Sequence, residues 1–241
     1  MTMTPLSDAQ IIPFYLTSGA ENVALIRGRI ASVGQPATAI LQRHAYPPAI
    51  AKMQAEALAL TACLASTLKF DGIFTLQAKG DALVRTLFAD MTSEGDLRGY
   101  AAFDADAPNF GNAISTMPSN VPELMGSGHI AFTIDEGVTG GRYQGIVDLK
   151  GATLSDAATA WFANSEQLDT LVLAASHQQD QQWQATAMML QRIATEGGEN
   201  CSASDLGLGE EAWHTAKTLM ESVRFDEMVD PHLSPEALIF R

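Results

Sequence analysis

Cysteine is scarce in this sequence. The 241 residues include two cysteines, Cys63 and Cys201, too few for a disulfide framework and not spaced as a pair of metal ligands. We therefore expect two free thiols in a reducing cytoplasm, with no disulfide between them and no zinc or other cofactor held by this chain. The five histidines are scattered singly, with none beside a cysteine, and give no support to a histidine metal site.

Basic residues and long apolar runs are also few. Lys and Arg number 14 against 28 Asp and Glu, and residues 150–241 hold 14 acidic residues against 5 basic ones. A surface of that sign repels phosphate backbones, which argues against a nucleic-acid partner. The longest uncharged apolar stretch, Ala57–Leu68, is too short to cross a bilayer, and the first ten residues lack the basic and apolar regions of a secretory signal. We expect a soluble cytoplasmic protein that binds no membrane.

Apolar residues are plentiful, at 46% of the chain, and their spacing predicts a long helix over Pro47–Lys69. The paired prolines Pro47 and Pro48 suit a first helical turn. A stripe at three- and four-residue spacings follows, and alanines lie opposite to it. We expect this helix to pack on two sides, with Cys63 in the core. The stripe is Ile50, Met53, Ala57, Leu60, Leu64 and Leu68, and the alanines are Ala55, Ala59 and Ala62.

Most other patterns are those of short strands joined by tight turns. Such connections favour antiparallel hairpins, because a parallel pair needs a crossover of a dozen residues or more. The predicted fold class is therefore α+β, a mainly antiparallel sheet core packed around the long helix, followed by a C-terminal helical region. The predicted strands are Asn22–Val33, Ile73–Ala78, Ala82–Ala89, Leu97–Phe103, His129–Asp135, Arg142–Leu149 and Thr170–Ala175.

The C-terminal third changes character along its length. Leu154–Leu168 has helical spacing, His177–Gln184 is typical of a polar turn, and Ala187–Ile193 fits a strand or a helix. A linker is predicted at Thr195–Ser204. Helices are predicted at Glu210–Val223 and from Ser234-Pro235 onward. We divide the chain into a core domain, 1–195, and an acidic helical linker region, 196–241.

The residues give no catalytic constellation, and we predict no catalytic residue and no enzyme. The glycine-rich segment Gly137–Gly145 lacks the spacing and the lysine of a P-loop, and it lies between two strand patterns, so a hairpin turn is favoured. Two alternatives stay open. One is a small-molecule enzyme that uses the loop Asp104–Pro122 and the glycine-rich turn near Gly141; the other is a structural or assembly domain.

Several stretches resemble the heat shock protein 33 family, the redox-regulated holdase chaperones. The similar stretches come in family order and cover the chain from about Phe14 to Arg241. They are Leu68–Gly72 (LKFDG), Leu76–Asp81 (LQAKGD), Leu97–Tyr100 (LRGY), Gly141–Val147 (GRYQGIV), Ser165–Leu168 (SEQL) and Met188–Gln191 (MMLQ).

The resemblance implies an ATP-independent holdase that binds unfolding proteins under oxidative or heat stress. Family members hold zinc in a C-terminal domain through a Cys-x-Cys and a Cys-x-x-Cys, and oxidation of those thiolates releases the zinc and unfolds the linker. Neither motif occurs here. We therefore expect this chain to end at the boundary between linker and zinc domain, and Cys63 and Cys201 do not inherit the redox role.

The implied partners are unfolded or partly folded client proteins, and a homodimer is compatible with the family. We expect clients to contact apolar side chains of the linker region, which can dock on the core or be available to a client. These candidate client-binding residues are Trp213, Leu219, Met220, Leu238, Ile239 and Phe240.

Overall fold

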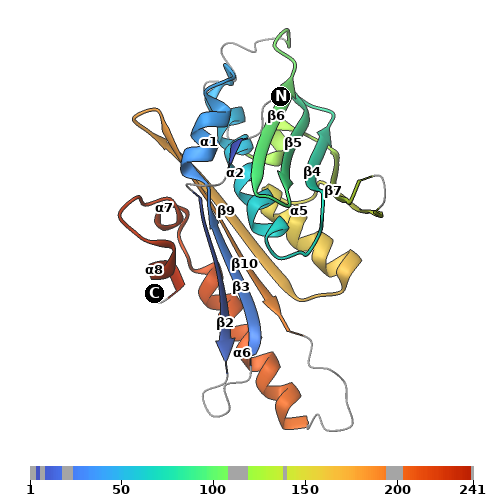
Figure 1. Ribbon diagram of the computed structural model, residues 1–241, viewed down its shortest axis with the longest axis vertical. Helices are drawn as coiled ribbons and strands as arrows, with labels where there is room; N and C mark the ends of the chain where they lie inside the picture. Colours follow the sequence, from blue (N-terminus) through green and yellow to red (C-terminus); the bar gives the residue numbers. More distant parts are fainter. Residues whose placement is uncertain are drawn as a thin grey trace.

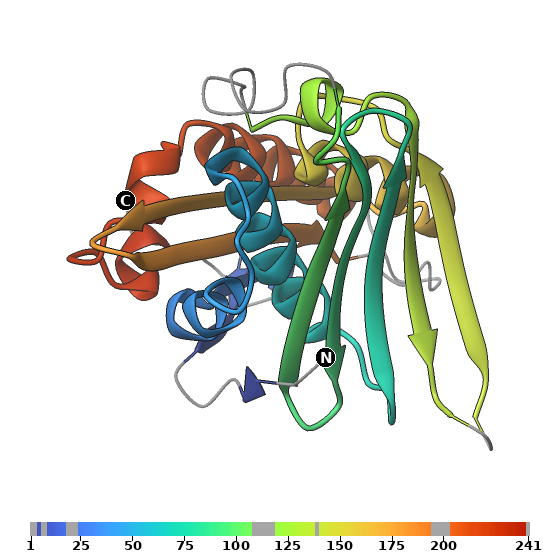
Figure 2. The same cartoon turned by 90° about the horizontal axis from the view of Figure 1, so that it is seen from above.

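The computed structural model describes residues 4–5, 9–17, 24–107, 119–137, 140–193 and 203–239. They form two antiparallel sheets with a helix between them (Figures 1 and 2). The six-stranded sheet A has the order β1 (Thr4–Pro5), β6 (Asp96–Phe103), β5 (Val84–Thr92), β4 (Ile73–Gly80), β7 (Gly128–Asp135) and β8 (Arg142–Asp148). The four-stranded sheet B has the order β2 (Gln10–Thr17), β3 (Ala24–Ser32), β10 (Gln182–Arg192) and β9 (Thr170–Gln179). The α+β class and the antiparallel pairing are confirmed.

Helix α2 (Pro48–Ala65) lies between the two sheets, as Figure 2 shows. On one side the side-chain amide of Gln54 donates to the carbonyl of Phe88 in sheet A, at 3.0 Å. On the other side the Ser176 hydroxyl of sheet B donates to the carbonyl of Lys52, also at 3.0 Å. Small residues on the helix let both sheets approach its backbone closely. The expected two-sided packing is confirmed, and Ala55, Ala59, Ala62 and Cys63 are all fully buried.

The turn predicted at His177–Gln184 is wrong. Strands β9 and β10 continue through that stretch and pair residue for residue as far as Gln179 and Gln182. The turn itself is the two residues Asp180 and Gln181, both with positive φ (50° and 63°). This conformation matches the twist of a two-residue hairpin, so the long ladder continues through polar sequence. Ala187–Ile193, which was open between strand and helix, belongs to β10 except for its last residue.

The helix predicted over Leu154–Leu168 is shorter and irregular. Regular α5 (Leu154–Trp161) begins with a capping box between Thr153 and Asp156. It continues as a single π-helical turn, η1 (Phe162–Glu166), which ends where Gln167 takes a left-handed φ of 53°. Three short helices are not predicted from the sequence, α1 (Gly34–Leu41), α4 (Val121–Leu124) and α7 (Phe225–Met228).

The C-terminal region is helical, as expected. It forms α6 (Ala203–Glu221), α7 (Phe225–Met228) and α8 (Pro235–Ile239), so α6 begins seven residues before the predicted Glu210. The helices pack against strands of sheet B, as Figure 1 shows. Residues 194–202, which hold most of the predicted linker, lie outside the described residues.

One partly buried acid, Glu56, links α2 to sheet B and gives a testable pH dependence. Ser176 on β9 donates to Glu56 Oε1 at 3.3 Å, and burial raises the pKa of Glu56 to about 7, against a smaller lowering by Lys52. The native protein therefore holds this proton more tightly than the unfolded chain, whose value is near 4.5. The stabilisation is complete below pH 4.5 and is lost as the pH rises through 7.

We expect Glu56→Gln to remove the part of the pH dependence of stability that comes from protonation of Glu56. In urea denaturation between pH 5 and 8, the free energy of unfolding of the unmodified protein should fall by about 1–3 kcal/mol more than that of the variant. Equal pH slopes for the two proteins would show that Glu56 titrates normally in the fold.

Candidate client-binding surface

One face of sheet B is apolar and looks away from α2. Strand alternation sends Ile26 and Ile30 to this side of β3, while Ala31 and Val33 face α2. The register brings Met188 of β10 opposite Ile30. We define the apolar face as Phe14, Leu16, Ile26, Ile30, Met188 and Leu190, which all belong to one hydrophobic cluster that is separate from the cluster around α2.

The ring of Phe14 lies directly over Gly28. A Cβ at position 28 would come within 2.0 Å of that ring, so glycine is required for the edge strand β2 to lay its phenylalanine across the sheet. The side chain is thus a part of the apolar face and not of the strand edge.

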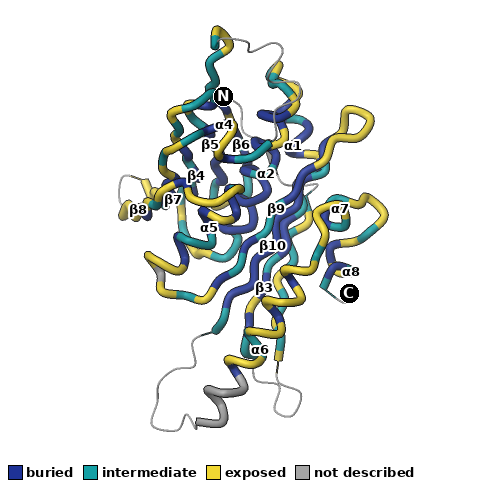
Figure 3. Tube along the Cα trace, turned by 180° about the vertical axis from the view of Figure 1, so that it is seen from behind, coloured by how far each residue is buried: buried dark blue, intermediate teal, exposed yellow. Residues whose placement is uncertain are grey.

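The three C-terminal helices cover this face, and we call α6, α7 and α8 together the cover. Ala216 and Met220 of α6, Met228 of α7 and Leu238 of α8 are at most 7% exposed and lie in the same cluster as the apolar face. Along α6, buried positions alternate with exposed ones (Figure 3). The fit is incomplete, because a cavity of about 490 Å³ remains between cover and sheet. Apolar residues line most of it, including Phe14, Leu16, Met188, Leu190, Val223 and Ile239.

The structure brings together four of the six residues predicted to contact clients. Leu219, Met220, Leu238 and Ile239 line the cavity. Trp213 is half-buried beside the same cluster, and Phe240 lies outside the described residues. The four do not share one orientation, since Leu219 is 61% exposed whereas Met220 and Leu238 are buried against the sheet.

Sequence reasoning missed the larger part of this surface, the apolar face itself. The alternation in Asn22–Val33 was visible, and it predicted a half-buried strand. However, the pairing of β3 with both β2 and β10 joins segments up to 166 residues apart, at Ile26 and Arg192, and no local pattern shows which of the two strand faces meets the cover.

Electrostatic contacts hold the cover weakly. Residues 203–239 contain eight Asp and Glu against two Lys and Arg. The ion pairs described there, Lys217 with Glu221 and Arg224 with Asp226, are local and exposed, and such pairs contribute little to stability. Helices of four and five residues, such as α7 and α8, are unstable alone in water. Attachment of the cover therefore rests on its apolar contacts with sheet B.

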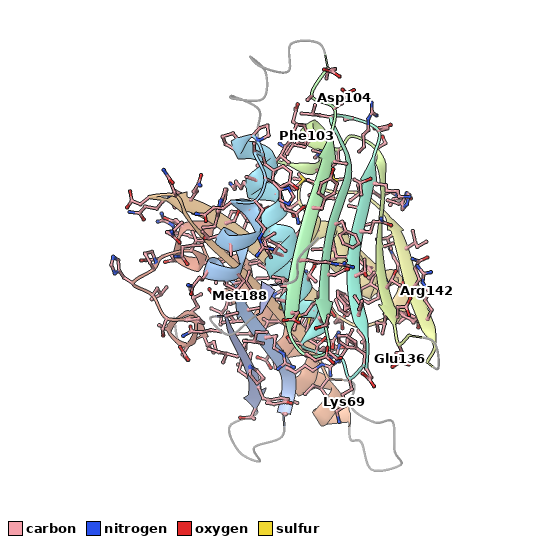
Figure 4. All side chains as sticks on the ribbon, turned by 45° about the horizontal axis from the view of Figure 1, so that its top comes forward. Lys69, Phe103, Asp104, Glu136, Arg142 and Met188 are labelled. Carbon is pink, nitrogen blue, oxygen red and sulfur yellow. The ribbon has the colours of Figure 1, made fainter. Side chains whose placement is uncertain are left out.

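The elements of the alternative enzyme site lie far apart. Asp104 follows β6 at one end of sheet A, while the β7–β8 turn lies at the other end, where Asp135 pairs with Arg142 (Figure 4). An eight-residue strand separates these ends by roughly 25 Å. The described residues of the loop and of the glycine-rich turn therefore do not converge on one site. The turn is a hairpin connection, although Val138 and Thr139 at its tip and residues 108–118 of the loop lie outside the described residues.

The comparisons with known proteins agree with this arrangement. The family model described as Hsp33 protein matches residues 15–241. The chain belongs to the Hsp33 family. A 33 kDa chaperonin of Caulobacter vibrioides is 35% identical over 222 residues, which are 90% of this chain and 70% of that protein. A 33 kDa chaperonin of Pseudomonas putida is 39% identical over 145 residues, 60% of this chain and 46% of the relative.

A solved structure supports the same fold. The crystal structure of the 33 kDa chaperonin from Thermotoga maritima, a heat shock protein 33 homolog, superimposes with a TM-score of 0.74 over 95% of this chain and 73% of that one, at 19% identity. At that identity the match concerns the fold of the Hsp33 family and not the details of any site.

The family resemblance implies zinc, but the described part of this Hsp33 chain contains no group of side chains that could bind it. No three His, Cys, Asp or Glu side chains are grouped there as a metal site requires. Cys63 is fully buried in α2, and Cys201 lies outside the described residues. Burial raises the pKa of the Cys63 thiol to about 12, more than nearby Arg29 lowers it. Among the described helices, none is long and apolar enough to span a membrane.

Proposed function

We propose that this chain acts as an ATP-independent holdase that binds unfolding proteins on the apolar face of sheet B when the cover detaches. The observation that supports this most directly is the incomplete, mainly apolar contact between cover and sheet, with its 490 Å³ cavity. Relatives named chaperonin support the chaperone class. The clients would be partly folded proteins, met in the cytoplasm.

Detachment of the cover need not disturb the rest of the fold. The cluster around α2 and the cluster beneath the cover are separate, and elements with few apolar contacts open at lower free energy than the global fold. Opening would expose branched and aromatic side chains together with Met188 and Met220, whose flexible thioethers adapt to varied partners. An exposed apolar surface of this kind binds unfolded chains without chemical specificity.

The acidic charge of the cover fits the same proposal. Detached helices with eight acidic residues repel one another in neighbouring molecules, which keeps the opened protein in solution. This charge also disfavours nucleic acid as a partner. A homodimer remains compatible with the proposal, since opened apolar faces can also bind each other.

The function is tested by light scattering of a chemically denatured client, with the protein reduced and then peroxide-treated. We expect suppression of aggregation near a one-to-one ratio, equal in the two states and without ATP. The reason is that peroxide acts through thiolates that have a resolving partner nearby. The buried Cys63 thiol with its raised pKa presents almost no thiolate, and Cys201, which lies outside the described residues, has no neighbouring cysteine in the sequence. Strong activation by peroxide would contradict this expectation for the 241-residue chain, and failure to suppress aggregation in either state would contradict the holdase.

A further inference from the structure

A second cavity, of about 220 Å³, lies beyond the C-terminal end of α2 and between the two sheets. We call it the aromatic cavity. Its inner wall is made of Phe74 and Phe132 from sheet A, Trp161 at the end of α5 and Phe162 of η1, and all four are less than 8% exposed. Ring centroids are 4.7 Å apart for Phe132 and Trp161. At the rim, Tyr143 is 48% exposed. The cavity therefore combines an aromatic interior with an open mouth.

Two local features build the wall. Gly145 of β8 lies against Trp161, and a Cβ there would be 1.9 Å from the indole nitrogen, so the ring occupies the space of a side chain. The π-helical turn η1 is closed by the Leu168 amide donating to the Phe162 carbonyl at 3.2 Å, which brings both residues to the cavity. Single π-turns occur frequently at functional sites. The stretches Gly141–Val147 and Ser165–Leu168, which the cover does not use, thus meet here.

A positioned arginine lies at the same cavity. Arg27 Nε donates to Gln191 Oε1 at 2.7 Å, and Nη2 donates to the same oxygen. Gln191 is 1% exposed and is held in turn, because its amide nitrogen donates to the Thr170 hydroxyl at 2.9 Å. The guanidinium is therefore oriented by a neutral, buried amide.

Arg27 has no acidic partner in the described part of the chain, where no carboxylate oxygen lies within 4 Å of it. Arg98 and Arg192, by contrast, are paired with Asp90 and Asp169. Arg27 is itself exposed, so in a protein with twice as many acidic as basic residues it presents a solvent-accessible positive charge beside an aromatic wall. That combination is complementary to a ring that carries an anion.

We propose that the aromatic cavity binds a small aromatic carboxylate, with the ring against Trp161 and Phe132 and the carboxylate on the free N–H groups of Arg27. The guanidinium is planar and matches a carboxylate with two parallel hydrogen bonds. The volume suits one ring with a short side chain and excludes a folded segment. Because alternate residues of β3 face opposite sides, this site is independent of the apolar face, which uses Ile26 and Ile30.

The test is isothermal titration of the 241-residue protein with 3-phenylpropionate. Two further ligands each carry one of its two binding groups. 3-Phenylpropan-1-ol has the ring without the charge, and propionate has the charge without the ring. We expect saturable one-to-one binding of the aromatic acid, and binding at least about tenfold weaker for each of the other two. No saturable binding of the acid, or equal binding of the alcohol, would overturn the proposal, and this comparison needs no variant.

Two variants then test whether Arg27 supplies the positive charge that binds the carboxylate. Arg27→Gln should weaken 3-phenylpropionate at least about tenfold, whereas Arg85→Gln, an exposed arginine of sheet A, should leave the affinity unchanged. Circular dichroism verifies that both variants remain folded. Unchanged affinity in folded Arg27→Gln would also overturn the assignment. Neither result depends on chaperone activity, so this proposal and the holdase can fail separately.

Discussion

Replacing Met220 by glutamate is expected to open the cover and to raise client binding. Met220 is 4% exposed and packs in the cluster of the apolar face. A carboxylate without a partner in that environment costs more than about 1.4 kcal/mol, so the equilibrium between closed and open cover should shift by more than about tenfold. The readouts are the fluorescence of a dye that binds exposed apolar surface and the client-to-protein ratio needed to suppress aggregation.

Thr218→Glu is the matched control. It adds the same charge two residues away, on the exposed side of α6, and should change neither readout. Each variant is made together with Trp213→Phe, which removes the tryptophan of the cover. Near-ultraviolet circular dichroism then reports Trp161 and Trp183 and should stay the same in both variants, because the cluster around α2 that holds them is separate from the cover. If Met220→Glu bound no more dye than Thr218→Glu, or lost suppression while still folded, the cover would not be the element that limits client access.

Truncating Leu58 to alanine is expected to cause the largest loss of stability among single substitutions of α2. Leu58 is fully buried, and its Cδ2 lies against Gly99 of sheet A, where an added Cβ would approach it to 2.8 Å. The two flanking sheets limit how far this site can collapse around a cavity. The free energy of unfolding should therefore fall by about 2–5 kcal/mol, measured by urea denaturation.

Lys52→Ala provides the comparison on the same helix. The Lys52 side chain is exposed, and its interaction with Ser176 uses the backbone carbonyl, which alanine retains. The free energy of unfolding should change by no more than about 0.5 kcal/mol. A loss below 1 kcal/mol for Leu58→Ala would mean that α2 is not the tightly packed centre of the fold.

The central helix and the antiparallel class could be predicted from the sequence because their signals are local. Ala55, Ala59 and Ala62 repeat along one side of a helix, and that spacing alone requires close neighbours on both faces. The hairpin of β9 and β10 could not be predicted. Its tip is rich in glutamine and lies in solvent, so the ladder hydrogen bonds rather than any apolar pattern continue the strands there.

The candidate client-binding surface likewise has one part that could be predicted from the sequence and one part that could not. Apolar positions of the cover, such as Met220 and Leu238, follow helical spacing and were predictable. The apolar face depends on three strands in register, with Phe14 over Gly28 and Ile30 opposite Met188. These contacts join distant segments and appear only when the chain is folded.

Site-specific photo-crosslinking shows directly whether clients bind the apolar face of sheet B. Benzoylphenylalanine is placed at Phe14, on the apolar face, or at Tyr100, which is 43% exposed on sheet A, each in the Met220→Glu protein with a denatured client. We expect client adducts from position 14 and few or none from position 100. Adducts mainly from position 100, or none from position 14 while aggregation is still suppressed, would contradict this expectation.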